Sequence, residues 1–232
     1  MRAVRAILVN FDGTACLHDV AEHLLDEFGD PSWPEYDEAL ARGEIGTLEA
    51  IRAQAAMLDA PLERMVDFVL EHCPLDPTFP PFVGWLESMG IPVTIASDGF
   101  GFYIEPILRA SGVGHVPVVT NTWVPGAAPP QVLHRNGHPE CVGCGTCKML
   151  AVLHDRDLHG PVGFIGEGYS DRYGSLYSDV VFAKKDLVGL CEADGVPFRP
   201  WETFDDVRAA LETMDGPPGA VAPQRCPGWT TA

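Results

Sequence analysis

Apolar runs that end abruptly at small polar residues recur along this chain. The first run, residues 3–11, is rich in strand-forming residues and stops at Asp12, Gly13 and Thr14. Such a run predicts a buried strand that delivers a polar loop at its carboxyl end. Four further runs predict strands at residues 91–96, 116–120, 162–165 and 180–183.

Between the first two predicted strands, the spacing of apolar residues changes to that of helices. Three apolar faces lie at Val20, Leu24, Leu25 and Phe28, at Leu48, Ile51, Ala55 and Leu58, and at Met65, Val66, Val69 and Leu70. These faces predict an all-helical insertion. Later strands alternate with helices near residues 82–89 and 103–110, which predicts a parallel sheet covered on both faces. The expected fold is therefore α/β and Rossmann-like, with a small helical cap inserted after the first strand.

The same pattern divides the chain into one core with insertions. We expect an α/β core at residues 1–16 and 78–215, a helical cap at 17–77, an irregular loop or small β-excursion rich in Cys and His at 123–147, and a flexible tail at 216–232. A chain of 232 residues is long enough for such a core and short for two independent enzymes.

The composition of the chain argues against some classes of binding partner. The formal net charge of −18, from 33 acidic and 15 basic residues, opposes binding to nucleic acid or to an anionic membrane. The apolar start at residues 6–9 is too short for a signal peptide or a membrane helix, and seven cysteines, an odd number, fit reduced thiols. We expect a cytoplasmic protein, and the composition leans weakly toward a bacterial source. An exposed apolar face of the cap would permit a homodimer.

Small polar groups occur in four segments, most of them directly after predicted strands. The segments are Asn10-Phe11-Asp12-Gly13-Thr14, Ser97-Asp98-Gly99, Lys148 and Gly166-Glu167-Gly168-Tyr169-Ser170-Asp171. Taken singly, each could be a turn, a helix cap or a solvated surface group. Ligands of open α/β sheets bind at the carboxyl ends of the strands. The order and spacing of the four segments therefore favour one shared site.

In this order, the segments resemble the haloacid dehalogenase superfamily, whose first motif, Asp-x-Asp-x-Thr, is followed by Ser or Thr, Lys and an acidic pair. The resemblance spans about residues 3–211. A helical insertion directly after the first motif is similar to the phosphoserine-phosphatase group, and residues 144–148 and 164–185 look closest to the methionine-salvage enol phosphatase branch. The resemblance implies a magnesium-dependent phosphatase of small phosphate monoesters that works through an aspartyl-phosphate intermediate.

The resemblance also implies a role for each matching residue. Asn10 stands at the nucleophile position, Asp12 matches the general acid and base, and Ser97 and Lys148 match the groups that bind phosphoryl oxygens. Mg²⁺ would be held by Asn10, Asp12, Glu167 and Asp171. Candidate substrate contacts are Thr14, Asp98, Gly99 and Asp19, of which Asp19 could equally be a helix N-terminal acid.

Two positions depart from this pattern. The neutral amide of Asn10 is a poor nucleophile, so no aspartyl phosphate should form at a useful rate, and the Mg²⁺ site loses one charge. Glu167 is one methylene longer than the usual aspartate. Asn10 is either an engineered substitution that traps substrate or a natural loss in a protein that kept its pocket. Because the rest of the constellation is complete, we favour an engineered or recently lost nucleophile.

His138, Cys141, Cys144 and Cys147 recur at every third position of the irregular loop. Cys-x₂-Cys spacing can present thiolates to Zn²⁺, although a structural site usually pairs two separated knuckles. The alternative is a loop of reduced thiols that positions Lys148.

Three functions compete on these observations. The first is a small-molecule phosphatase slowed or silenced by Asn10, and the second is a phosphate-ester binding or regulatory module of the same fold. The third is a phosphoryl transferase or a phosphonate-cleaving relative. The chain contains no lysine before Lys148, which counts against a Schiff-base lysine in the cap.

Overall fold

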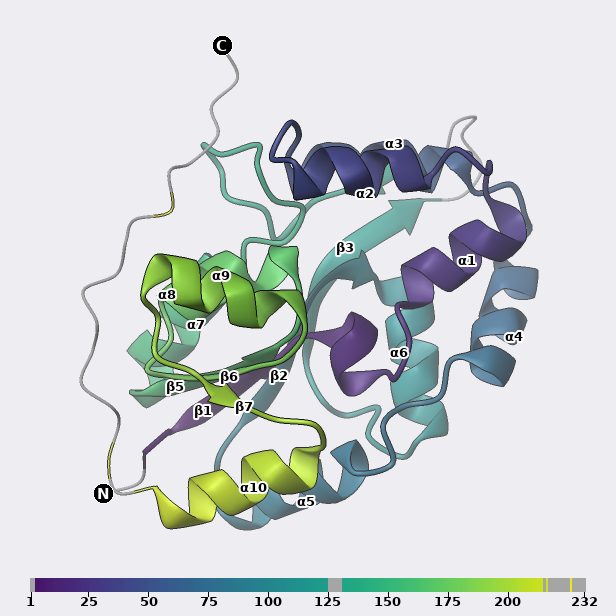
Figure 1. The fold of residues 1–232 in the computed structure, drawn as a ribbon. Coiled ribbons are helices and arrows are strands. Elements are labelled where there is room, and N and C mark those ends of the chain that lie inside the picture. The colour runs from purple at the N-terminus through teal and green to yellow at the C-terminus, as the bar shows by residue number, and fades with distance from the viewer. Residues whose placement is uncertain (1–2, 125–130, 215, 217–225, 227–232) are drawn as a thin grey trace.

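The computed structural model describes residues 3–124, 131–214, 216 and 226. Within these residues, seven strands form one sheet in the order β4-β3-β2-β1-β5-β6-β7 (Figure 1). Neighbouring strands are parallel except for β3 and β4, which run antiparallel. The strands are β1 (Ala6–Val9), β2 (Val93–Phe100), β3 (Val118–Val124), β4 (Gln131–Leu133), β5 (Val162–Gly166), β6 (Val180–Ala183) and β7 (Arg199–Pro200).

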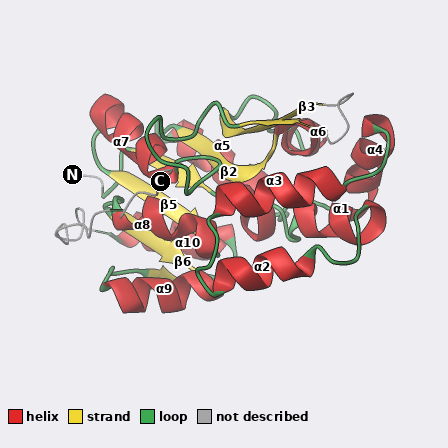
Figure 2. Ribbon diagram, turned by 90° about the horizontal axis from the view of Figure 1, so that it is seen from above, coloured by secondary structure: helices red, strands yellow, loops and turns green. Residues whose placement is uncertain are grey.

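The central strand β1 is buried on both faces because its four residues are all apolar. Ile7 and Val9 pack into one core and Ala6 and Leu8 into another, as alternating strand residues must. Helices therefore cover both faces of the sheet (Figure 2). One face carries α5 (Phe79–Ser88), α6 (Gly101–Ala110) and α10 (Phe204–Thr213), and the other carries α7 (Lys148–His159), α8 (Arg172–Leu176) and α9 (Asp186–Asp194). The predicted α/β, Rossmann-like class is confirmed.

Four helices lie between the turn that follows β1 and the helix α5, grouped at one side of the molecule (Figure 1). They are α1 (Val20–Phe28), α2 (Pro34–Ala41), α3 (Thr47–Met57) and α4 (Leu62–His72). The apolar pattern does not predict α2, because none of its residues is buried. The insertion begins and ends at one point, where Cys16 and Leu75 form an antiparallel bridge. We propose that this insertion acts as the cap.

Strand ends differ from the expected ones where side chains, rather than the apolar pattern, set the backbone. The first strand stops at Val9 because residues Phe11–Ala15 wind into a tight turn. Strand β2 continues past residue 96 to Phe100. Beside it, the Thr120 hydroxyl donates to the Gly99 carbonyl (2.6 Å) and the Asn121 amide donates to the Asp98 carbonyl (2.7 Å). These polar bonds extend the pairing of β2 and β3.

The Cys- and His-rich loop does not assemble the predicted zinc site. Among the described residues, no group of three or more His, Cys, Asp or Glu side chains could hold a metal ion. Two of the four predicted ligands serve local turns instead: the Glu140 backbone N–H donates to Nδ1 of His138 (3.1 Å), and the Gly143 N–H donates to the Cys141 sulfur (3.4 Å). The loop ends at Lys148, the first residue of α7. Zn²⁺ at His138, Cys141, Cys144 and Cys147 is therefore not supported.

Of the expected tail, only residues 216 and 226 fall within the described ranges, so the prediction of flexibility lies outside them. No helix in the described part of the chain has the length and apolar character needed to cross a membrane.

Candidate active site

A buried turn follows β1 and carries the first polar segment. The Asn10 backbone N–H donates to the Ile165 carbonyl on β5 (2.9 Å), which continues the sheet by one residue. Gly13 then adopts a φ of +62°, in the left-handed region that favours glycine. The turn keeps Asn10 and Asp12 at the carboxyl end of the sheet, and both are nearly inaccessible to solvent.

The Asn10 amide is bonded at both of its ends. Its Oδ1 accepts a hydrogen bond from Nζ of Lys148 (3.0 Å), and its Nδ2 donates to the Asp12 carbonyl (3.0 Å). Lys148 has only donors, so the amide oxygen must face it and the amide nitrogen must face the carbonyl. The side chain of Asn10 is therefore held in one orientation.

Lys148 is the most deeply buried cation of the site, with a relative exposure of 2%. Besides Asn10, its ammonium donates to the Ser170 hydroxyl (2.8 Å) and to Oδ1 of Asp171 (2.6 Å). All three donors are thus used, as a buried ammonium requires. Lys148 joins the first and the last polar segments of the sequence.

The acidic pair after β5 is engaged within the chain. Oδ2 of Asp171 accepts the backbone N–H groups of Glu167 (2.8 Å) and Gly168 (3.1 Å), while its Oδ1 accepts Lys148. The carboxylate of Glu167 forms an ion pair with Lys185. Burial raises the pKa of Glu167, and Lys185 opposes that rise.

Asp12 faces away from Lys148, toward β2 and α6. Its carboxyl accepts hydrogen bonds from the Ser97 hydroxyl (3.1 Å) and the Tyr103 hydroxyl (3.1 and 3.2 Å), and from the Val20 N–H (3.2 Å). Burial, reinforced by the nearby charge of Asp19, raises the pKa of Asp12 to about 8. At neutral pH this carboxyl can hold a proton.

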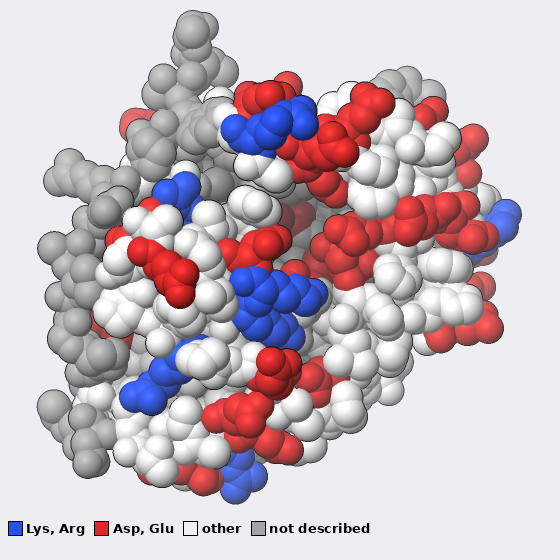
Figure 3. Space-filling view, viewed as in Figure 1, with Lys and Arg blue, Asp and Glu red and all other residues white. Residues whose placement is uncertain are grey.

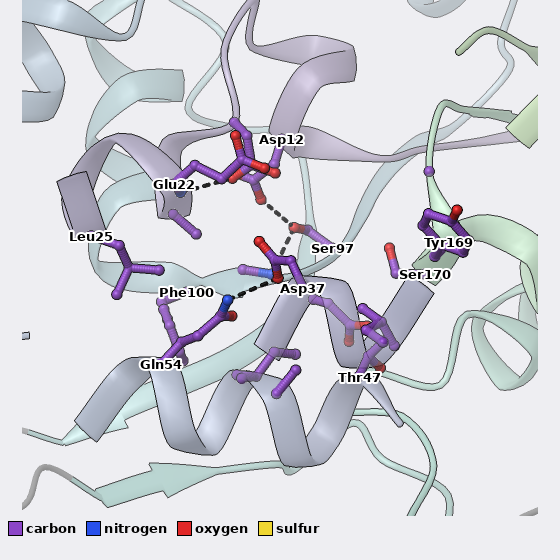
Figure 4. Close-up of a pocket in the computed structure, with 18 of the residues that line it drawn as sticks. Asp12, Glu22, Leu25, Asp37, Thr47, Gln54, Ser97, Phe100, Tyr169 and Ser170 are labelled. Carbon is purple, nitrogen blue, oxygen red and sulfur yellow. Dashed lines mark hydrogen bonds between the residues drawn. The ribbon is translucent and has the colours of Figure 1, made fainter. Parts of the chain in front are cut away.

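A cavity of about 520 Å³ opens in front of these groups. Its far wall comes from the helical insertion, where Leu25, Ile51 and Leu58 are apolar while Glu22 and Asp37 are acidic. Figure 4 shows Asp12 and Ser97 at one end of this cavity and Gln54, which donates to Asp37 (2.8 Å), across from them. On the surface, the hollow is bordered by many acidic residues, with a basic patch at its rim (Figure 3).

The structure brings most of the predicted site residues to this cavity. Asn10, Asp12, Ser97 and Glu167 line it, and so do the predicted substrate contacts Asp19, Asp98 and Gly99. Asp19 also caps α1, because it accepts the Glu22 N–H (3.1 Å). Thr14, Lys148 and Asp171 lie behind this lining, each in contact with Asn10 or with a residue bonded to it.

Sequence reasoning missed Lys185, which reaches Glu167 from the loop after β6. Tyr103, for which the sequence favoured packing over a place in the pocket, bonds directly to Asp12. It lies in the first turn of α6, shortly after Ser97-Asp98-Gly99. No signal in the sequence indicates Lys185, because its direction depends on a φ of +47°.

The residues present do not fit a divalent cation as they stand. In the described part of the chain, no three His, Cys, Asp or Glu side chains gather at this point, so an ion here would depend on the Asn10 side chain and the Asp12 carbonyl. Asn10 turns a donor, not an oxygen, toward the Asp12 carbonyl, and the Glu167 carboxylate is paired with Lys185. A hard cation requires oxygen ligands turned toward it.

No family model matches this chain. Two curated relatives named 2-hydroxy-3-keto-5-methylthiopentenyl-1-phosphate phosphatase are similar to it. The one from Bacillus velezensis is 25% identical over 214 residues, which cover 90% of each chain. The one from Brevibacillus brevis is 26% identical over 221 residues, which cover 90% of this chain and 95% of the relative.

Solved structures give the same picture of the fold. A substrate-bound phosphoserine phosphatase superposes with a TM-score of 0.70 at 16% identity, over 93% of this chain and all of that one. A phospho-aspartyl intermediate analogue of phosphoserine phosphatase gives 0.69 at 16% identity, over 92% of this chain and all of that one. The expected resemblance to haloacid dehalogenase phosphatases of the phosphoserine-phosphatase group, and to their methionine-salvage branch, is confirmed.

Proposed function

We propose that this chain, which has the haloacid dehalogenase fold, carries a phosphatase site for small phosphate monoesters that Asn10 holds in a binding state without turnover. The observation that carries the proposal is the meeting of Asn10, Asp12, Ser97 and Lys148 at the end of one cavity. The names of the curated relatives support the same class of substrate.

The arrangement suits phosphoryl transfer if position 10 carries a carboxylate. One oxygen of that carboxylate would attack phosphorus as the bond to the ester oxygen breaks. The Lys148 ammonium, 3.0 Å from Oδ1 of Asn10, supplies positive charge beside the reacting group, and the Ser97 hydroxyl can donate to a phosphoryl oxygen. With Asn10 in place of the carboxylate, the chain has no nucleophile at this position, while Lys148 and Ser97 remain to bind the phosphoryl group.

Asp12 is the proposed proton donor. With a pKa raised to about 8 it keeps its proton at neutral pH, and Ser97 and Tyr103 fix the direction of its carboxyl. The proton would pass to the departing ester oxygen, and Asp12 would then accept a proton from the water that hydrolyses the phosphorylated side chain.

Mg²⁺, when bound in such a site, offsets the charge of the phosphoryl group. Because the donor set with Asn10 does not fit the ion, we propose a Mg²⁺ requirement only for the form with aspartate at position 10. In that form, a carboxylate oxygen of residue 10 would face the Asp12 carbonyl oxygen, near Glu167. In the unmodified chain, the Asn10 amide bridges these two positions with a hydrogen bond.

The cavity favours a compact organic ester. Leu25, Ile51, Leu58 and Phe100 offer apolar surface to the part of the ligand remote from the phosphate. The curated relatives are named for a small phosphate ester of this general kind.

The proposal is tested by comparing the unmodified chain with Asn10→Asp in a phosphate-release assay on a panel of phosphomonoesters with Mg²⁺. We expect Asn10→Asp to gain activity by at least about 10²-fold, because it restores the nucleophile. The double variant Asn10→Asp/Asp12→Asn serves as the matched control and should lose most of the gain, since its proton donor is absent.

A second candidate function is a phosphate-ester binding module that never turns over. The closed amide network of Asn10 favours it, because every polar atom of that side chain has a partner inside the chain. Ligand binding by Asn10→Asp without any phosphate release would support this second function and contradict the first.

A further inference from the structure

We propose that this chain binds the phosphate group of its ligand without a divalent cation, with the ammonium of Lys185 supplying the charge that a metal would otherwise bring. This inference rests on the proposed function, because it assumes that the cavity takes a phosphate ester. It assigns Lys185 as a binding residue of the site.

The first observation is the Asn10 amide. Two oxygens, one from the side chain at position 10 and one from the Asp12 carbonyl, could lie side by side only with a cation between them. Here Nδ2 of Asn10 donates directly to that carbonyl (3.0 Å), so the contact is satisfied without an ion. The second end of the amide is held by Lys148 (3.0 Å), which keeps it from turning over.

The second observation is the position of the Glu167 carboxylate. An added Cβ on Gly13 would overlap this carboxyl group, which therefore lies directly against the turn that follows Asn10. Lys185 pairs with the carboxylate there, and the charge of Lys185 is also felt by Asp19 at the cavity wall. A single-charged ammonium thus stands beside the acid expected to hold a metal.

The third observation is that both carboxylate oxygens of Asp171 already accept hydrogen bonds within the chain. Asp171 is fully buried, and its two oxygens accept Lys148 and the backbone N–H groups of Glu167 and Gly168. These bonds fix the loop and the lysine, which is a structural task that needs no ion.

Charge balance agrees with this geometry. Asparagine in place of aspartate at position 10 removes one negative charge, and Lys185 adds one positive charge, so together they supply the two units that one Mg²⁺ carries. The full sequence contains three lysines, Lys148, Lys184 and Lys185. Two of them converge on this site in a chain with a net charge of −18.

The neighbouring lysine provides a matched control. Lys184 lies over the ring of Trp201, 3.9 Å from its centroid, and feels the charge of Glu167, whereas Lys185 is the lysine that forms the ion pair with Glu167. Lys185 is exposed and has a φ of +47°, which turns the two adjacent side chains apart.

The experiment measures the binding of inorganic phosphate by calorimetry, once with EDTA and once with Mg²⁺. The unmodified chain should give the same Kd within about twofold in both solutions. Lys185→Gln should weaken binding at least about tenfold in both, while Lys184→Gln should leave it unchanged and Lys185→Arg should retain it. Asn10→Asp should bind phosphate at least about tenfold more tightly with Mg²⁺ than with EDTA.

The outcomes separate this inference from the proposed function. Phosphate bound by the unmodified chain only with Mg²⁺ would overturn the inference and leave the proposed phosphate site standing. Binding by Lys185→Gln equal to that of the unmodified chain would overturn the role of Lys185. Phosphate bound in neither solution would overturn both proposals. The comparison of EDTA with Mg²⁺ needs no variant, so it does not depend on the folding of Lys185→Gln.

Discussion

Asp12 is a carboxyl group whose protonation should influence the stability of the whole chain. Burial raises its pKa in the folded protein to about 8, and Asp19 adds to the effect, while Ser97, Tyr103 and the Val20 N–H oppose it. In the unfolded chain the same carboxyl loses its proton near the ordinary aspartate pKa of 3.8. Between these values the folded state holds the extra proton, so the free energy of unfolding contributed by Asp12 falls as pH rises.

We therefore predict that Asp12→Asn flattens the pH dependence of stability. Between pH 5 and pH 8 the unmodified chain should lose stability relative to the variant, by on the order of 1 kcal/mol per pH unit. Urea unfolding at each pH measures this difference. The exposed Asp59→Asn should retain the slope of the unmodified chain, and a slope in Asp12→Asn as steep as that of the unmodified chain would refute the prediction.

Some side chains of the site could be predicted from the sequence, and others could not. Asn10, Asp12, Ser97 and Lys148 were predictable because each belongs to one of four short polar segments arranged in a known order. Lys185 was not, because its contact with Glu167 depends on an unusual backbone angle at one residue. The orientation of the Asn10 amide likewise follows from Lys148, which is 138 residues distant in the sequence.

Among the secondary-structure elements, the turn Phe11–Ala15 is the one most tightly fitted to the site. Gly13 has a φ of +62°, and the space where its Cβ would lie is taken by the Glu167 carboxyl group. Gly43 has a similar φ of +71° at an exposed turn, with open space around it. A comparison of these two glycines therefore distinguishes the cost of the left-handed backbone, which both share, from the cost of crowding by Glu167, which only Gly13 has.

Alanine at these two positions should therefore have different effects. Gly43→Ala should cost about 1–2 kcal/mol of unfolding free energy, from the left-handed backbone alone. Gly13→Ala should cost more and should also weaken phosphate binding, because Glu167 must leave Lys185. Urea unfolding and phosphate calorimetry measure the two effects, and equal losses at both positions would show that the Glu167 contact is unimportant.

Elements whose apolar residues are buried were the ones that the sequence predicted best. The fifth predicted strand matches β6 (Val180–Ala183), whose four residues are all buried. The helix α2 has no buried residue and β7 is a two-residue edge strand, so no pattern indicated them. The short edge strand β4 lies where the sequence left a loop or a small β-excursion open. Burial leaves a periodic signal, whereas polar bonds between side chains and backbone leave none.

For the whole molecule, acidic charge extends from the surface into the cavity. Glu22 and Asp37 line the cavity together with Asp12, and burial together with Asp19 raises the pKa of Glu22 to about 7. Burial is the larger cause of this rise, and the charges of Asp19 and Asp37 add to it. A ligand that brings a second negative charge to this wall would be repelled, and one that brings a positive charge would be attracted.

Two phosphate monoesters of equal carbon number test this expectation. Phosphoethanolamine carries an ammonium group where phosphoglycolate carries a carboxylate, so we expect the unmodified chain to bind phosphoethanolamine at least about tenfold more tightly. Calorimetry in low salt measures the ratio, which should shrink in Glu22→Gln/Asp37→Asn. A preference for phosphoglycolate would contradict the electrostatic reading of the cavity.

The junction of the helical insertion bears on how this protein could evolve. Cys16 and Leu75 pair as the chain leaves and re-enters the sheet, and the Asp76 N–H donates to the Ala15 carbonyl (2.9 Å) next to them. The residues between them form a closed excursion from one point, and none of them pairs with β1, whose partners are β2 and β5. Recombination between related genes could therefore graft another excursion at this point, giving the same phosphate-binding edge a new ligand wall in one event.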